Sequence, residues 1–326
     1  MATPPIVTQY AGPTPYKLNN FVTGNDVFTS PLYPNQISDL AIWLDGKDIL
    51  NNGSNNPADG TPVSVWANKA PNSIIVNQDT IAYRPVFNSV DKGVVFSNTN
   101  SVTKGTINGL DTTYFSGNKY ETIFILLNNK LSANNYTLLS PTSTKDKYIY
   151  LLSNTSTETI LTTGTDGVLL ESGNVTEGTP TLVSTWNSNG AIYHYINGLL
   201  TGNTNKPAYE AGANTLIGTD NYIEENANGF NGSISEIIIY SNVLSDSERQ
   251  KVESYLYWKW GTFILDKDNP YKEEAYSNYL YPNIDSNLIP AVPRNLFSGE
   301  PTLDSNNYPL IKNFIQLPNI LKNTKF

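Results

Sequence analysis

The chain contains one histidine, His194, which lies between two tyrosines in the run Tyr193-His194-Tyr195. A hydrolytic triad needs a histidine with a nucleophile on one side and a carboxylate on the other. No Gly-x-Ser-x-Gly segment supplies such a nucleophile, and no phosphate-binding glycine loop with a lysine is present. We therefore expect His194 to be a structural residue of a strand and expect no catalytic residue around it.

Two short stretches concentrate carboxylate and amide side chains, and they contain Asp220, Asn221, Glu224, Glu225 and Asn226 in one case and Asp45 and Asp48 in the other. Hard oxygen ligands of these types are the ones that Ca²⁺ prefers in proteins. Neither stretch has the fixed ligand spacing of a dedicated calcium loop, and an acidic loop that is simply solvated has the same composition. The residue types therefore allow a calcium site without requiring one.

Cysteine is absent, so disulfides, zinc–thiolate sites and thiol nucleophiles are excluded. The formal net charge of the 326 residues is -9, and the basic residues are scattered singly or in loose pairs such as Lys145 and Lys147. A nucleic-acid-binding surface needs clustered Lys and Arg, and an acidic surface is repelled by anionic membranes. We therefore expect neither nucleic acid nor a membrane as a partner.

The segment from residue 37 to 265 is predicted to consist of many short strands separated by turns. The candidate strands are short apolar or alternating runs, at residues 41–44, 63–66, 93–96, 122–127, 148–152, 159–162, 181–186, 191–196 and 233–240. The dipeptide Asn197-Gly198 suits a tight hairpin turn after the run that ends at Ile196. This pattern is typical of an antiparallel sandwich or barrel.

One helix is predicted at about 246–260. Ser245 and Glu248 form a capping box, in which each side chain can bind a free backbone amide of the first turn. Val252, Leu256 and Trp260 recur at a spacing of four and so share one face of the helix. Gly261 follows where a helix end favours a residue with positive φ.

Both ends of the chain differ from this central domain. Residues 1–36 are rich in proline and are predicted to form an extended N-terminal arm, with a floppy tail as the alternative for the first dozen residues. Residues 266–326 combine regularly spaced prolines with Tyr, Phe, Leu and Ile, which indicates a C-terminal arm that lies against its own sandwich or against a neighbouring molecule. The first ten residues lack the features of a secretory signal, and no apolar run approaches the roughly 20 residues of a membrane span, so a soluble protein is expected.

Two blocks of the chain resemble one known family. The first block opens with Leu40-Ala41-Ile42-Trp43-Leu44-Asp45-Gly46-Lys47-Asp48 and continues through residues 63–70, 84–87 and 93–96. The second runs from Phe230 to Tyr240, passes through residues 243–249 and ends at Tyr255-Leu256-Tyr257-Trp258-Lys259-Trp260-Gly261. Together they resemble the laminin-G-like, concanavalin A-like lectin/glucanase domains, of the kind found in proteins of large DNA viruses, phages and bacterial surfaces.

The resemblance covers residues 37–262 and implies an all-β, two-sheet antiparallel jelly-roll sandwich. It also implies that a glucanase of this fold would carry a Glu-x-Asp-x-x-Glu pattern on one strand, with one carboxylate as nucleophile and another as acid. That pattern is absent: Glu236 is the one acidic residue of its apolar strand, and Glu224-Glu225 has no following partner at strand spacing. We therefore predict that the protein is not an enzyme, unless the fold brings two distant carboxylates together in an open cleft.

Members of this family often hold Ca²⁺ at the rim of the sandwich. The resemblance therefore makes Asp220, Asn221, Glu224 and Glu225 the candidate metal ligands. It implies no other cofactor. Trp43, Trp66 and Trp260 are large enough to dominate the core of a sandwich, and exposure of one of them for sugar stacking is the alternative.

These observations predict a non-enzymatic structural or interaction protein. The leading hypothesis is a minor capsid, cement or fibre component of a large virus particle, located in the virion, with residues 1–36 and 266–326 contacting other structural proteins of the assembly. The alternative is a lectin-like module that binds glycans, with Ca²⁺ at the acidic loop. Fold alone does not decide between these two, because this fold hosts lectins, glycosidases and scaffolds.

Overall fold

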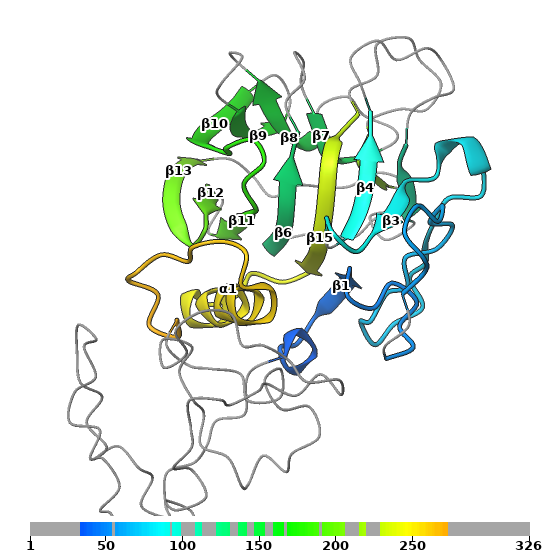
Figure 1. Ribbon diagram of the computed structural model, residues 1–326. Coiled ribbons are helices and arrows are strands. Elements are labelled where there is room, and N and C mark those ends of the chain that lie inside the picture. Colours follow the sequence, from blue (N-terminus) through cyan, green and yellow to red (C-terminus); the bar gives the residue numbers. More distant parts are fainter. Residues whose placement is uncertain are drawn as a thin grey trace, which may run out of the picture. The chain divides into compact units, whose positions relative to one another are not determined.

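The structure is a computed structural model. It describes residues 33–53, 56–91, 93–98, 108–112, 122–130, 136–141, 147–153, 159–165, 168–188, 191–205, 215–219 and 229–272. Within this part of the chain, two antiparallel sheets and one α-helix form the jelly-roll sandwich that the sequence predicts (Figure 1).

The first sheet contains eight strands and faces the viewer in Figure 1. Seven of them lie side by side in the order β13 (Leu199–Asn205), β12 (Ala191–Ile196), β11 (Thr181–Ser188), β6 (Thr122–Asn129), β15 (Asn231–Tyr240), β4 (Gly93–Ser97) and β3 (Val86–Asn88). The eighth, β1 (Leu40–Asp45), pairs with the second half of β15, whereas β4 pairs with the first half. The long strand β15 therefore holds three neighbours in place.

The second sheet contains seven strands. Their order is β10 (Val168–Asn174), β9 (Thr159–Thr165), β8 (Lys147–Ser153), β7 (Tyr136–Pro141), β14 (Thr215–Ile217), β5 (Leu110–Thr112) and β2 (Val76–Asn77). All strand pairs of both sheets are antiparallel, as expected for this fold class.

The central strands of the first sheet, β6 and β15, are buried on both faces. The inward side chains of the sheet, such as Ile125, Val183 and Ile237, belong to the main core cluster between the sheets. Its outward side chains, such as Phe124 and Tyr240, are also fully buried. A β-bulge between Ile234 and Glu236 shifts the alternation of side chains along β15. Because outward side chains such as Phe124 and Tyr240 are buried as well, another element must cover the outer face of the sheet.

Helix α1 (Asp246–Trp260) provides that cover, with the bounds predicted from the sequence. The capping box is formed by Ser245 and Glu248, and Gly261 ends the helix in the left-handed region at φ 60°. Val252, Tyr255, Leu256 and Trp260 are buried against the outer face of the first sheet. The short segment that follows turns back, and Asn269 donates to the carbonyl of Gln250 in the helix.

The turn Asn197–Gly198 joins β12 and β13, with both residues at positive φ, which confirms the predicted hairpin. The strand predicted at residues 63–66 is wrong. There Val63 donates to Pro85 and Trp66 to Val76, so the backbone of this segment bonds successive, unrelated partners. Trp66 is nevertheless fully buried in the core, as predicted.

Residues 33–36 and 266–272 lie beyond the predicted limits of the central domain and make contacts with it. The hydroxyl of Tyr240 donates to the carbonyl of Pro34 at 2.9 Å, and the backbone amide of Asp266 donates to the carbonyl of Asn197 at 2.8 Å. The other residues of the two predicted arms lie outside the described part of the chain. None of the helices in the described ranges has the length and apolarity that a membrane crossing requires.

Candidate functional site

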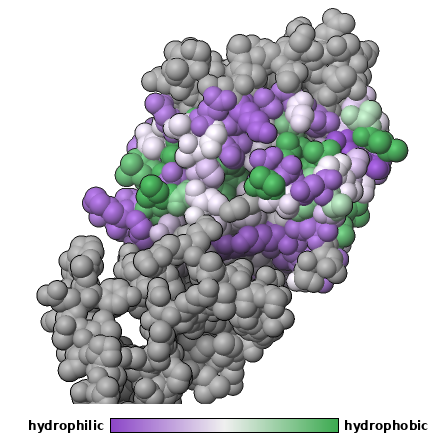
Figure 2. Space-filling model, viewed as in Figure 1, coloured by the Kyte–Doolittle hydropathy of each residue, from purple (hydrophilic) through white to green (hydrophobic). Residues whose placement is uncertain are grey.

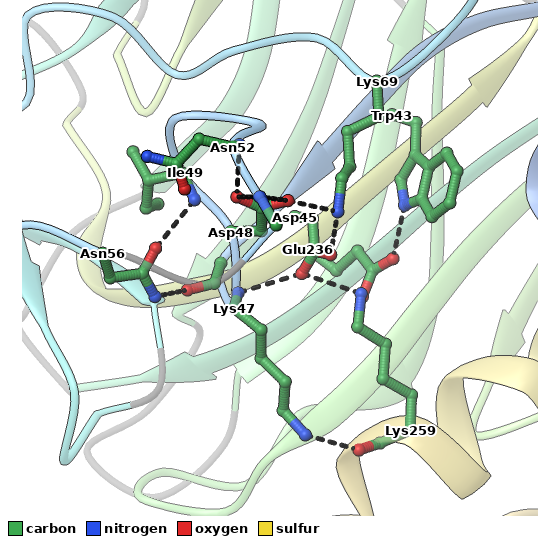
Figure 3. A network of polar contacts seen from close by, with 12 residues as sticks. Trp43, Asp45, Lys47, Asp48, Ile49, Asn52, Asn56, Lys69, Glu236 and Lys259 are labelled. Carbon is green, nitrogen blue, oxygen red and sulfur yellow. Dashed lines mark hydrogen bonds and ion pairs between the residues drawn. The ribbon is translucent and has the colours of Figure 1, made fainter. Parts of the chain in front are cut away.

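Two carboxylates from distant parts of the chain meet beneath helix α1 (Figure 3). Asp45 of β1 and Glu236 of β15 are directly opposed in the antiparallel register. The Nζ atom of Lys259 in α1 lies 2.7 Å from an oxygen of each carboxylate. The sequence placed Glu236 alone among apolar residues, and the fold supplies the acidic and basic partners that the strand itself lacks.

Three further hydrogen bonds fix the Glu236 carboxylate. Trp43 Nε1 donates at 2.7 Å, the hydroxyl of Tyr255 donates at 3.0 Å, and Trp260 Nε1 also donates to it. Trp43 and Trp260 are thus buried, as predicted, but they lie in the layer between the first sheet and α1. Their indole nitrogens satisfy a buried charge in addition to filling space.

Asp45 and Asp48 do not form a free acidic cluster. Lys69 Nζ lies 2.8 Å from Asp45 and 2.9 Å from Asp48. Asp48 also accepts the backbone amides of Asn52 and Gly53, so it orders the turn after β1. Both carboxylates are therefore paired with lysine, and the calcium interpretation of this stretch stays untested.

Burial and neighbouring charges shift the pKa values of the two opposed carboxylates in opposite directions. For Asp45, burial opposes ionisation, but Lys259 and Lys69 outweigh it and lower the pKa to about 2. For Glu236, burial is the largest effect and raises the pKa above 4.5, and the charge of Asp45 adds to this rise. Lys259 counteracts both effects at Glu236.

This buried network, which consists of Asp45, Glu236, Lys259 and Lys69, positions structural elements. Asp45 is 4% exposed and Glu236 is fully buried, so a substrate has no route to either carboxylate in this arrangement. Lys47 adds a bond to the carbonyl of Lys259 at 2.7 Å and so ties the turn after β1 to the end of the helix. The network holds β1, β15 and α1 in one fixed relation.

His194 is buried between the two sheets. Its Nδ1 atom lies 2.8 Å from Ser172 Oγ of β10, and Ser172 lies 3.2 Å from Thr201 Oγ1 of β13. Burial lowers the pKa of His194 to about 3, so the ring is neutral near pH 7. This contact joins the edge strands of the two sheets, in agreement with the structural role expected for His194.

The four predicted metal ligands, Asp220, Asn221, Glu224 and Glu225, lie outside the described residues. Among the residues that the structure describes, no group of three or more His, Cys, Asp or Glu side chains could hold a metal ion. The predicted calcium site therefore stays a prediction.

An aromatic pair lies on the outer face of the first sheet, beside the start of α1. Trp186 of β11 and Tyr193 of β12 are directly opposed, with ring centroids 5.3 Å apart and planes inclined by 47°. Both rings are partly exposed, and the exposed Asn203 of β13 is opposed to Tyr193. We call Trp186, Tyr193 and Asn203 the aromatic platform.

Contacts from behind hold the rings of the platform in place. Trp186 Nε1 donates to the carbonyl of Leu244 at 2.8 Å, and its ring lies 6.3 Å from that of Tyr195. The guanidinium of Arg249 lies 3.9 Å from the ring centre of Tyr195. Tyr193 is partly exposed, and within the described ranges its hydroxyl has no hydrogen-bond partner.

The sequence interpretation missed the platform, although one signal for it exists. The residues Asn189-Gly190 separate the predicted strands 181–186 and 191–196. This dipeptide is typical of a tight hairpin, and β11 and β12 pair Ser188 with Ala191 and, two residues further along each strand, Trp186 with Tyr193. How much of the two rings stays exposed depends on which part of the sheet helix α1 covers, and the dipeptide Asn189-Gly190 carries no information about that.

A shallow hollow of about 480 Å³ lies near the turn of the β12–β13 hairpin. Its lining includes Asn174, Leu199, Ile264 and Lys272. Leu199 and Ile264 are 56% and 81% exposed, and Figure 2 shows apolar side chains on the side of the molecule where β13 lies. This exposed apolar surface is separate from the network beneath α1.

The comparisons with known proteins agree with this fold. Residues 113–248 match the model of the concanavalin A-like lectin/glucanases superfamily. No curated protein sequence matches the chain.

Several solved structures are similar to the chain at low sequence identity. Domain 4 of AbnA, a GH43 extracellular arabinanase from Geobacillus stearothermophilus solved in complex with arabinotriose, is 19% identical with a TM-score of 0.39, covering 64% of this chain and 96% of that one. The CBM40 of the Ruminococcus gnavus IT-sialidase, bound to α2,6 sialyllactose, is 21% identical with a TM-score of 0.34, covering 40% and 82%. A Trypanosoma rangeli sialidase in complex with 2,3-difluorosialic acid is 13% identical with a TM-score of 0.47, covering 69% and 35%. Because all three TM-scores lie below 0.5, the fold assignment rests on the two sheets and the family match.

Proposed function

We propose that this protein is a non-enzymatic binding module that recognises glycans through the aromatic platform. The observation that carries this proposal is the pair of partly exposed rings, Trp186 and Tyr193, held at adjacent positions of two strands. Apolar ring faces with a few well-placed polar groups are typical of sites for small ligands. The C–H face of a sugar ring fits such a surface, while Asn203 and the Tyr193 hydroxyl supply hydrogen bonds to sugar hydroxyls.

The buried network supports a non-catalytic role. Glycosidases of the usual kind place two carboxylates on either side of the bond to be cleaved, and both must reach the substrate. Asp45 and Glu236 are close together, but α1 covers them, and both are held by Lys259. Exposing them to a sugar would require α1 to leave the sheet and would break the bonds that hold it there.

A glycan array with the purified protein tests the proposal. Wild type should give specific signals, and Tyr193→Ala should abolish them or weaken them by tenfold or more. Tyr83→Ala is the matched control, since Tyr83 is also partly exposed but belongs to the short helical turn η3 (Ile81–Tyr83), away from the three platform strands. Absence of specific binding, or binding that Tyr193→Ala leaves unchanged, would refute glycan recognition at the platform.

Calcium at the acidic loop is a separate part of the proposal. We propose Asp220, Asn221, Glu224 and Glu225 as its ligands, because their oxygens suit Ca²⁺. The array run with and without chelator tests this role. Binding that a chelator removes and added Ca²⁺ restores would support it, and chelator-insensitive binding would argue against it.

A role in an assembled particle, such as a virus particle, is the second candidate. The exposed side chains of Leu199 and Ile264 favour it, because they flank a hollow that also includes Lys272, the last described residue before the C-terminal segment. In this role residues 1–36 and 266–326 contact neighbouring subunits. Hydrogen exchange on the isolated protein tests it: rapid exchange of both segments beside a protected sandwich supports the assembly role, and protection equal to the core contradicts it.

A further inference from the structure

We infer that the aromatic platform selects uncharged saccharides and discriminates against saccharides that carry a carboxylate. The inference rests on the proposed glycan-binding function and adds the class of ligand. It follows from how the charges beside the platform are arranged.

Arg249, whose guanidinium lies 5.9 Å from the ring centre of Trp186, is already engaged. Arg249 lies behind Tyr195 and is only 3% exposed. Its Nε and Nη2 atoms donate to Asp246, and its Nη1 atom donates to Glu253. Recognition of a carboxylate by arginine uses a free pair of guanidinium donors, and here these donors face protein carboxylates.

The start of α1, which Trp186 contacts through the carbonyl of Leu244, carries acidic residues. Asp246 and Glu248 both lie in the first turn of α1, and the side chain of Asp246 is 63% exposed. The described residues of β11, β12 and β13 contribute no charged side chain that could offset them. An anionic saccharide on the platform therefore meets like charges at its edge.

The polar groups that face the surface are uncharged. The platform offers the Tyr193 hydroxyl and the Asn203 amide, and the exposed Asn205 follows on the same face of β13. Hydroxyl and amide groups donate to and accept from sugar hydroxyls, and they do not compensate a carboxylate's charge. This chemistry fits neutral hexoses and pentoses.

The test compares neutral glycans with their sialylated derivatives on the same array, using wild type, Tyr193→Ala and Asp246→Asn. We expect Tyr193-dependent binding to neutral glycans and about tenfold weaker binding to each sialylated derivative, a difference of about 1.4 kcal/mol. Asp246→Asn should narrow this difference severalfold and leave neutral binding unchanged. Asp268→Asn is the control, because Asp268 is exposed and pairs with Lys267 in the segment after α1.

The outcomes separate the two claims. Equal or stronger Tyr193-dependent binding of a sialylated glycan, relative to its neutral parent, would overturn the selectivity while leaving glycan binding intact. A lack of Tyr193-dependent binding to every glycan would refute the proposed function, and the selectivity with it.

Discussion

Asp45 and Glu236 face each other across β1 and β15, and Lys259 of α1 lies within hydrogen-bonding distance of both. Two like charges directly opposed in an antiparallel pair destabilise a sheet unless a cation lies between them. The lysine thus makes the pairing of β1 with β15 depend on the docking of α1. A buried network of this kind specifies one arrangement of three elements that are separated along the chain.

Removing Lys259 should therefore be severely destabilising. Lys259→Met leaves Glu236 without a cation and Asp45 with Lys69 alone, and we expect a loss of about 3–5 kcal/mol in the free energy of unfolding. Lys267→Met is the matched control, since Lys267 is 82% exposed and a solvent-exposed ion pair such as that with Asp268 adds little to stability. Denaturant unfolding measures both. Equal midpoints for the two variants would contradict the structural role of the network.

Much of the fold is predictable because its signals are local. The capping box of Ser245 and Glu248 and the left-handed Gly261 define α1 at both ends, and Asn197–Gly198 defines a hairpin. The run 63–66 has the composition of a strand, but its backbone bonds different partners in succession. Composition describes how well residues suit a pleated surface and does not provide a neighbouring strand.

The relation between Asp45 and Glu236 could not be predicted in the same way. The two residues are 191 positions apart in the sequence, and the bulge before Glu236 decides which face of β15 its side chain occupies. Only the three-dimensional register brings them together. The platform is an intermediate case. The dipeptide Asn189-Gly190 between the two predicted strands indicates the pairing of Trp186 with Tyr193, whereas the exposure of the two rings depends on the position of α1.

His194 should make the stability of the protein depend on pH. Burial lowers its pKa from 6.5 to about 3, so between these values the unfolded chain binds a proton that the folded chain excludes. Stability from this group is present above pH 6.5 and is lost as the pH falls, by up to about 1.4 kcal/mol per pH unit. His194→Asn should remove this contribution, so the variant should lose less stability than wild type between pH 6.5 and pH 5. Since the chain has no other histidine, an unchanged slope between pH 6.5 and 5 would contradict a buried neutral ring.

Glu253 should make stability depend on pH in the opposite direction to His194. Burial raises its pKa from 4.5 to about 7, even though Arg249 acts to lower it. The folded state therefore keeps a proton that the unfolded state loses, so stability falls as the pH rises from 4.5 to 7. Glu253→Gln should remove this loss, as measured by unfolding at a series of pH values. Glu171→Gln, which replaces an exposed carboxyl, is the control; a Glu253→Gln variant with the same pH profile as wild type would refute the assignment.

The N-terminus of α1 should depend on Ser245. Its hydroxyl accepts the backbone amide of Glu248, and Glu248 in turn accepts the backbone amide of Ser245. Ser245→Ala should lower the free energy of unfolding by about 1 kcal/mol. Ser245→Asn, which retains a capping oxygen, should recover most of this loss. If alanine and asparagine are equivalent in thermal unfolding, the cap contributes nothing at this position.

The most direct test of the central claim is a crystal structure of the protein with the neutral glycan that gives the strongest array signal. Glycan binding at the platform predicts a sugar ring against Trp186 and Tyr193, with Asn203 hydrogen-bonded to its hydroxyls. A sugar bound elsewhere on the molecule, with the aromatic platform empty, would contradict the claim.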